Sequence, residues 1–202
     1  MNSILLKIIT MEVIMALQRR DLNYICLASR GLDINFQYEY GRTPLMIEIM
    51  YYGSSPTFIT ILLKNPFIDI NAIDSDGHNA LHHAVLYSPK VLDTCRLLIN
   101  AGININTQDF NGQSVLSLYI SYAMRGTDVR IVKVLLDANI NTKLLNNVKR
   151  DALFYAGLAG KKDIVNMIVQ QRLRLLDLIM LAGDYLRILP KDIREYIKLF
   201  GL

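Results

Sequence analysis

Apolar positions along this chain fall into pairs of short helical stretches, and each pair is separated from the next by a polar turn. The second stretch of each pair is the clearest, since 58–64, 92–102 and 129–139 carry aliphatic residues at helical spacing. One landmark residue precedes each pair, and a small polar residue follows that landmark two positions later. The landmarks are Gly41, Gly77, Gly112 and Lys149, spaced by 35 to 37 residues, and the polar residues are Thr43, Asn79, Ser114 and Asp151. A helix pair repeated at this period predicts a stack, because one such unit cannot bury a core alone.

The repeated unit resembles the ankyrin repeat, whose pattern is D-x-x-G-x-T-P-L-H-x-A, a glycine turn, V-x-x-L-L and G-A-x-x-N. Block 41–46 (GRTPLM) keeps the T-P-L segment, and block 77–84 (GHNALHHA) keeps Leu81, His82 and Ala84. Blocks 112–118 and 149–169 keep Leu116 and Leu153, and Asn71, Asn106 and Asn141 stand near repeat ends. The resemblance implies an all-α ankyrin-repeat solenoid of about five repeats with C-terminal capping helices, acting as a non-enzymatic protein–protein interaction module.

The repeat register divides the chain into an array and a C-terminal cap. We predict an ankyrin array over 1–169, with approximate repeats 1–37, 38–73, 74–108, 109–145 and 146–169, and a helical cap over 170–202. The first of these repeats is divergent, and a further helical run is predicted over 172–186. Pro44 suits the first turn of a helix, where its missing N–H has no partner to lose. Gly102 is expected to end a helix in the left-handed conformation, and Asn139 to replace glycine in that role.

Composition and cysteine usage favour a reduced, non-membrane setting. The apolar run 4–17 contains Lys7 and Glu12, lacks a basic start and is too short to span a bilayer, so a capping helix is preferred to a signal peptide. Cys26 and Cys95 are predicted to lie two repeats apart, beyond disulfide reach, as small buried apolar residues. We therefore expect the protein in the cytoplasm, which is the host cytoplasm if the protein is viral, or in the nucleus.

The net charge of +4 is unevenly distributed. Segment 143–174 is strongly basic, and a basic stripe attracts nucleic acid or acidic partners. However, this segment contains no nucleic-acid module, and its two aromatic residues, Phe154 and Tyr155, are predicted to face the core. A solvated end face is the favoured interpretation, and nucleic-acid binding is the alternative.

The histidines are concentrated in one block, as His78, His82 and His83. His82 occupies the position at which the ankyrin pattern places a histidine that hydrogen-bonds neighbouring backbone. A metal site would need further ligands at compatible spacing, and only Cys95 and acidic loop residues are at hand. We therefore favour a structural role for His82 and expect no metal, no cofactor and no catalytic residue.

In ankyrin arrays the concave surface is formed by the turn fingers and the solvent side of each first helix. Counting eight residues from Thr43, Asn79 and Ser114 leads each time to a tyrosine, whereas the last repeat has Ala159 there. Tyrosine is enriched at binding hot spots, but these tyrosines could instead cover the ends of adjoining helices. The candidate partner-binding residues are Tyr40, Arg42, Tyr51, His78, Tyr87, Phe110, Gln113, Tyr122 and Arg150.

The terminal segment 188–202 resembles the opening of an F-box, L-P-x-[DE]-[IL]-x-x-x-[IL]-x-x-[FL]. Ankyrin arrays that end in such a shortened segment are a poxvirus arrangement, which implies a host target on the array and a ubiquitin-ligase adaptor on the tail. The candidate adaptor-binding residues are Leu189, Pro190, Ile193, Ile197 and Phe200. One apolar stripe of the same helix also suits a plain C-terminal cap. The alternative function is an IκB-like competitive decoy without a ligase, or a nucleic-acid-binding protein.

Overall fold

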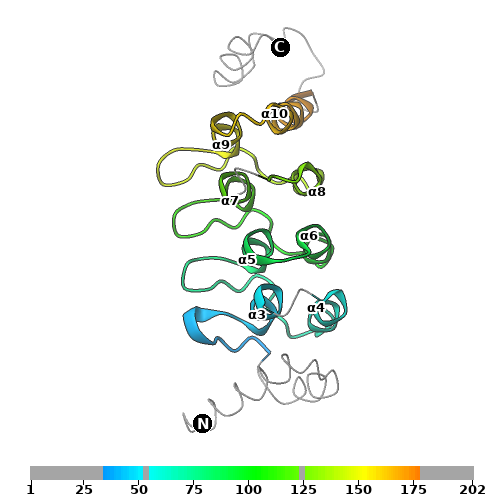
Figure 1. Ribbon diagram of the computed structural model, residues 1–202. Coiled ribbons are helices and arrows are strands. Elements are labelled where there is room, and N and C mark those ends of the chain that lie inside the picture. The colour runs from blue at the N-terminus through cyan, green and yellow to red at the C-terminus, as the bar shows by residue number, and fades with distance from the viewer. Residues whose placement is uncertain (1–33, 52–54, 123–125, 178–202) are drawn as a thin grey trace.

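A computed structural model describes residues 34–51, 55–122 and 126–177, and these residues form an all-α stack (Figure 1). A short 3-10 turn, η1 (Glu39–Gly41), precedes four helix pairs. The pairs are α3 (Pro44–Tyr51) with α4 (Pro56–Leu63), α5 (Ala80–Tyr87) with α6 (Val91–Asn100), α7 (Val115–Tyr122) with α8 (Val129–Asp137), and α9 (Ala152–Leu158) with α10 (Lys162–Asp177). The described residues contain no named strand, and only an isolated bridge joins Gln108 to Ser114. The predicted all-α repeat stack is confirmed.

The helices form two parallel columns that share one apolar core. Helices α3, α5, α7 and α9 pack in sequence in one column, and α4, α6, α8 and α10 pack in sequence in the other (Figure 1). The register leucines lie in this core, because Leu81 and Leu116 are fully buried and Leu153 is 6% exposed. The buried cluster runs without a break from Leu45 to Val169. Each helix pair therefore depends on its neighbours for burial, as expected of a solenoid.

The small polar residue of each repeat begins the first helix of its pair. The side-chain oxygens of Thr43, Asn79, Ser114 and Asp151 each accept a hydrogen bond from the backbone N–H three residues later. These bonds satisfy N–H groups that have no partner inside the helix. Pro44 is the first residue of α3, as its fixed φ and missing N–H predict.

Between consecutive pairs the chain extends into turn fingers, which project on one side of the stack (Figure 1). Each finger is joined to the next by a backbone hydrogen bond near its tip: Ser75 N–H to Tyr40 O, Phe110 N–H to Asp76 O, and Asn147 N–H to Asn111 O, at 2.8 to 3.0 Å. The landmark glycines of these fingers all have positive φ, and so does Lys149, at 60°. A Cβ on Gly77 would lie 2.8 Å from the backbone nitrogen of Phe110, so the stacking of fingers leaves room only for glycine there.

The asparagines near the repeat ends form a second connection between repeats. The side-chain oxygens of Asn35, Asn71 and Asn106 each accept a backbone N–H from the next repeat, 33 to 35 residues later, at 2.7 Å. Gly102 and Asn139 have φ values of 85° and 61° after their helices, which confirms their predicted left-handed caps.

Two expectations for the C-terminal part need comment. Helix α10 is continuous from Lys162 to Asp177, so the predicted boundary between residues 169 and 170 falls inside one helix. The prediction that Phe154 faces the core is wrong, because this residue is 43% exposed, whereas Tyr155 is half-buried. The predicted run 172–186 extends beyond the described residues, and most of the first repeat, with Cys26, and the segment 188–202 lie outside them.

Candidate binding surface

The fingers and the exposed ends of the first helices form one surface, which we call the finger face. It contains the nine candidate partner-binding residues, and five of them are large aromatic side chains that solvent reaches. Tyr40, Tyr51, Tyr87, Phe110 and Tyr122 are between 47% and 72% exposed. Arg42, His78 and Gln113 are half-buried, and Arg150 is exposed. Exposed aromatic residues gathered on one side are typical of an interaction surface.

The three register tyrosines share one structural position. Tyr51 and Tyr122 are the last described residues of α3 and α7, and Tyr87 is the last residue of α5. Each presents roughly half or more of its surface to solvent, so none belongs to the core. Helix α9 ends at Leu158 and has Ala159 at its C-cap, so the fourth described pair carries no aromatic ring there.

Arginine side chains order the aromatic residues at both ends of the finger face. The Arg42 guanidinium lies over the Tyr40 ring, 4.9 Å from its centroid, and its Nη1 donates to the Tyr51 hydroxyl at 3.0 Å. Arg150 lies over the Phe154 ring at 4.7 Å. Such contacts hold long side chains in place and reduce the side-chain entropy that is lost on binding.

The middle of the finger face rests on histidine rings. The His83 ring stacks with Tyr87 at 5.8 Å between centroids, and His78 meets His83 edge to face at 5.6 Å. Partial burial raises the pKa of Tyr87, and the neighbouring Tyr122 phenol adds to this shift. Tyr87 is thus held from below by a buried ring while its outer face stays open.

The base of each of the last three described fingers is built around one Asx side chain, whereas the first finger has Tyr38 at this position. One oxygen of Asp74 accepts the backbone N–H groups of Asp76 and His78, and Asp109 and Asn146 accept the equivalent pairs two and four residues on. The second polar side-chain atom has a different partner in Asp74 and in Asn146. Asp74 Oδ2 accepts from His83 Nε2 at 2.8 Å, while Asn146 Nδ2 donates to the Tyr155 hydroxyl at 2.8 Å.

Two of the three histidines are buried and held neutral. His82 Nδ1 accepts the Asn79 backbone N–H at 3.3 Å, which confirms its predicted structural role. Burial lowers the pKa of His82 to about 3 and also lowers the pKa of His83, where the hydrogen bond to Asp74 opposes the shift. Burial raises the pKa of Asp74, but hydrogen bonds from His83 and from two backbone N–H groups outweigh it and lower that pKa to about 2.

The basic segment 143–174 is less available than its sequence indicates. Arg172 is 1% exposed, and it donates to the Thr142 carbonyl at 2.6 Å and to Asp151 Oδ2 at 2.7 Å. The Asp151 carboxylate therefore caps α9 with one oxygen and binds α10 with the other. This ion pair joins two helices and takes one cation away from the surface.

The sequence analysis missed the contact between Asp74 and His83. These residues are nine positions apart, and so are Asn146 and Tyr155, which make the equivalent contact two repeats later. That repeated spacing was the available signal. Cys95 is fully buried, as predicted, and is not part of the group of possible metal ligands that Asp74, His78 and His83 form.

Comparison with known families agrees with this geometry. Residues 13–109 match the model for ankyrin repeats (3 copies), and the helix pairs and fingers continue in the same form through α10. The chain thus contains ankyrin repeats. No curated protein matches its sequence. Ankyrin repeats imply a protein–protein interaction module, and proteins of this family are usually non-catalytic scaffolds. Within the described ranges, no helix has the length and apolar character needed to cross a bilayer.

Proposed function

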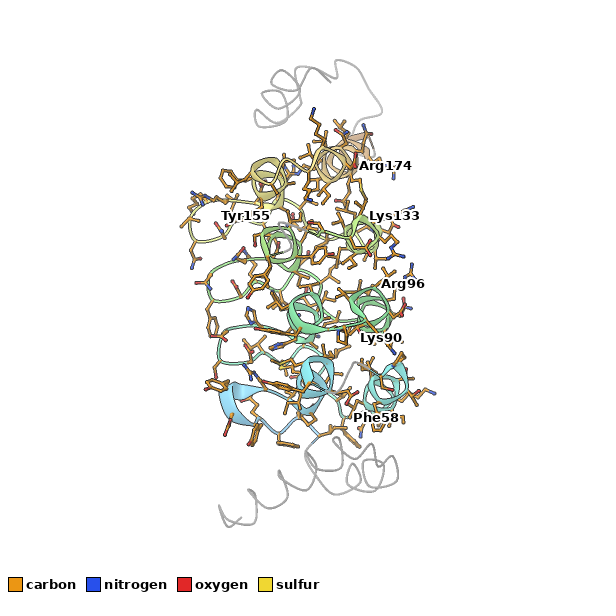
Figure 2. The ribbon with its side chains drawn as sticks, viewed as in Figure 1. Phe58, Lys90, Arg96, Lys133, Tyr155 and Arg174 are labelled. Carbon is orange, nitrogen blue, oxygen red and sulfur yellow. The ribbon has the colours of Figure 1, made fainter. Side chains whose placement is uncertain are left out.

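We propose that this chain binds a protein partner through the finger face. The observation that carries the proposal is the row of exposed tyrosines at the ends of α3, α5 and α7, flanked by Arg42 and Arg150. Tyrosine and arginine are the residues that most often supply binding energy in protein interfaces. The column of second helices, α4, α6, α8 and α10, differs from the finger face in its side chains. Figure 2 shows the cationic Arg96 and Lys133 along this column, on the side away from the fingers.

The first experiment compares three forms of the full chain as bait for proteins from a candidate host cell. The test variant changes Tyr51, Tyr87 and Tyr122 to Ser, and the control variant changes Arg96 and Lys133 to Ser on the second-helix column. The finger face predicts that the wild type and the control recover the same protein and that the tyrosine variant loses it. Equal recovery by all three would contradict the assignment, provided that circular dichroism shows equal helix content.

We further propose that the partner is a host protein and that segment 188–202 recruits a ubiquitin-ligase adaptor. Support comes from the sequence alone, through the F-box-like residues Leu189, Pro190, Ile193, Ile197 and Phe200. The abundance of Ile, Asn, Lys and Tyr, typical of AT-rich viral genomes, supports a viral source. Proteins recovered by the full chain and by a chain ending at Arg187 should then differ only in ligase subunits. Recovery of the same target without any ligase subunit by both forms would favour the competitive decoy.

Nucleic-acid binding is the weaker proposal. The cations of segment 143–174 support it, but the Arg172 guanidinium is buried in an ion pair with Asp151. If the protein binds nucleic acid, its affinity for duplex DNA should fall steeply with rising salt, because phosphate contacts release counterions.

A further inference from the structure

We propose that Asp74, His78 and His83 form a binding site for a divalent transition metal of the zinc class. One ligand atom from each of these residues lies within 4.8 Å of the other two. Imidazole nitrogen and carboxylate oxygen are zinc ligands, and a site with three protein ligands leaves a fourth position for water or another donor. The site lies below Tyr87, and metal binding there would be a function in addition to the proposed binding of a protein partner.

Three features of the cluster favour a cation. The side chains of Asp74 and Asp109 are 1% and 2% exposed, so two carboxylates are buried close to the same histidine. Backbone N–H groups already donate to both carboxylates, and a bound cation would add charge compensation to these hydrogen bonds. His83 is 1% exposed, and its Nε2 already faces Asp74 Oδ2. Both ring nitrogens of His78 lie near a carboxylate, at 4.0 Å from Asp74 Oδ2 and 3.6 Å from Asp109 Oδ2, beyond hydrogen-bond distance.

The distances define which atoms would bind the metal. Asp74 Oδ1 is occupied by two backbone N–H groups, whereas Oδ2 faces His83 Nε2 at 2.8 Å. Metal–ligand bonds of about 2.0–2.1 Å place neighbouring tetrahedral ligand atoms slightly more than 3 Å apart. The Asp74 and His83 atoms need to separate slightly, and the His78 ring needs to move inward. His78 can do so because its side chain is 14% exposed and belongs to the finger.

Proton positions are compatible with this arrangement. The neutral His83 ring would carry its proton on Nδ1 and offer the Nε2 lone pair to the metal, and the existing Nε2–H to Asp74 hydrogen bond is exchanged for two metal bonds. His78 would bind through Nδ1 and donate its Nε2–H to Asp109 Oδ2. A histidine ligand that donates its other ring N–H to a carboxylate is a common arrangement around zinc, because the carboxylate fixes the ring and its tautomer.

The alternative is that the cluster only fastens the finger to α5. Asn146 and Tyr155 make such a contact at the equivalent position of the last finger, without any histidine. His78 separates the two interpretations, because it is needed for a metal site but makes no side-chain hydrogen bond that holds the finger. Its backbone N–H, which does hold the finger, is unaffected by a change of side chain.

The test uses the full chain after removal of any histidine tag and measures Zn²⁺ binding by calorimetry and Co²⁺ binding by visible absorption. The test variant is His78→Gln, since the next repeat carries Gln113 at this position, and the control is Lys133→Gln on the second-helix column. We expect the wild type and the control to bind one Zn²⁺ per chain and to give the bands of tetrahedral Co²⁺. We expect His78→Gln to bind at least tenfold more weakly, while its melting temperature without metal is unchanged. Equal Zn²⁺ affinity of His78→Gln and the wild type would overturn the proposal, as would a wild type that gives no heat and no Co²⁺ bands.

Discussion

The contact between consecutive fingers can be tested by comparing two glycines that share one backbone conformation. Gly77 has a φ of 81° and Gly102 a φ of 85°. A Cβ at Gly77 would meet the backbone nitrogen of Phe110 at 2.8 Å, whereas a Cβ at Gly102 would meet nothing within 4 Å. Replacing each glycine with alanine therefore imposes the same left-handed strain, and only Gly77→Ala adds a collision with the next finger.

The expected magnitudes follow from these two terms. A left-handed conformation costs a non-glycine residue about 1–2 kcal/mol, so Gly102→Ala should lower the free energy of unfolding by that amount. Gly77→Ala should also displace the finger and break the hydrogen bond from Phe110 N–H to Asp76 O, which contributes about 1 kcal/mol. The total for Gly77→Ala is about 2–3 kcal/mol.

Urea titrations of both variants and of the wild type, followed by circular dichroism, measure the difference. The denaturant dependence should be unchanged, so that midpoints report stability alone. Gly77→Ala should lose at least about 1 kcal/mol more than Gly102→Ala. Equal losses would show that the hydrogen bonds and close contacts between consecutive fingers contribute nothing measurable to the stability of the stack.

The remaining predictions concern the core, the last finger and the buried thiol. Leu116→Ala and Leu153→Ala should each lower the free energy of unfolding by about 2–5 kcal/mol, because both leucines are buried; near-wild-type melting of both would refute the repeat register. Lys149→Gly should raise the free energy of unfolding by about 1 kcal/mol, since Lys149 has a φ of 60°, and an unchanged urea midpoint would contradict this. Burial raises the pKa of Cys95 to about 12, so a thiol reagent at pH 8 should label this residue only after denaturation, and labelling of Cys95 in the native protein at the rate of a free thiol would refute its burial.

The repeat architecture could be predicted from the sequence because each repeat carries the same pattern of residues independently. Thr43, Asn79, Ser114 and Asp151 are different residues, yet all can accept a hydrogen bond at a helix start, and their shared spacing identifies the helices. Gly77 and Gly112 lie against the backbone of the next finger, which leaves no room for a Cβ, while Lys149 adopts the same left-handed conformation at the equivalent position. Sequence reasoning therefore recovered the four described helix pairs and their caps.

Contacts that depend on the stacking of repeats were harder to predict. Phe154 occupies a position that the ankyrin pattern assigns to the core, yet it is exposed and lies under Arg150. The proximity of Asp74, His78 and His83 follows from the way a finger folds back over its own helix, which local helical spacing does not reveal. Exposure of the tyrosines was likewise undecided until the ends of α3, α5 and α7 were located.

The binding role of the finger face is tested most directly by calorimetry with a purified partner recovered by the full chain. The affinity of the wild type is compared with that of the variant in which Tyr51, Tyr87 and Tyr122 are changed to Ser, and the melting temperatures are measured in parallel. The finger face predicts a loss of affinity well over tenfold, which is about 1.4 kcal/mol, with an unchanged melting temperature. Unchanged affinity together with a collapse in stability would show that these tyrosines support the fold and that the partner binds elsewhere.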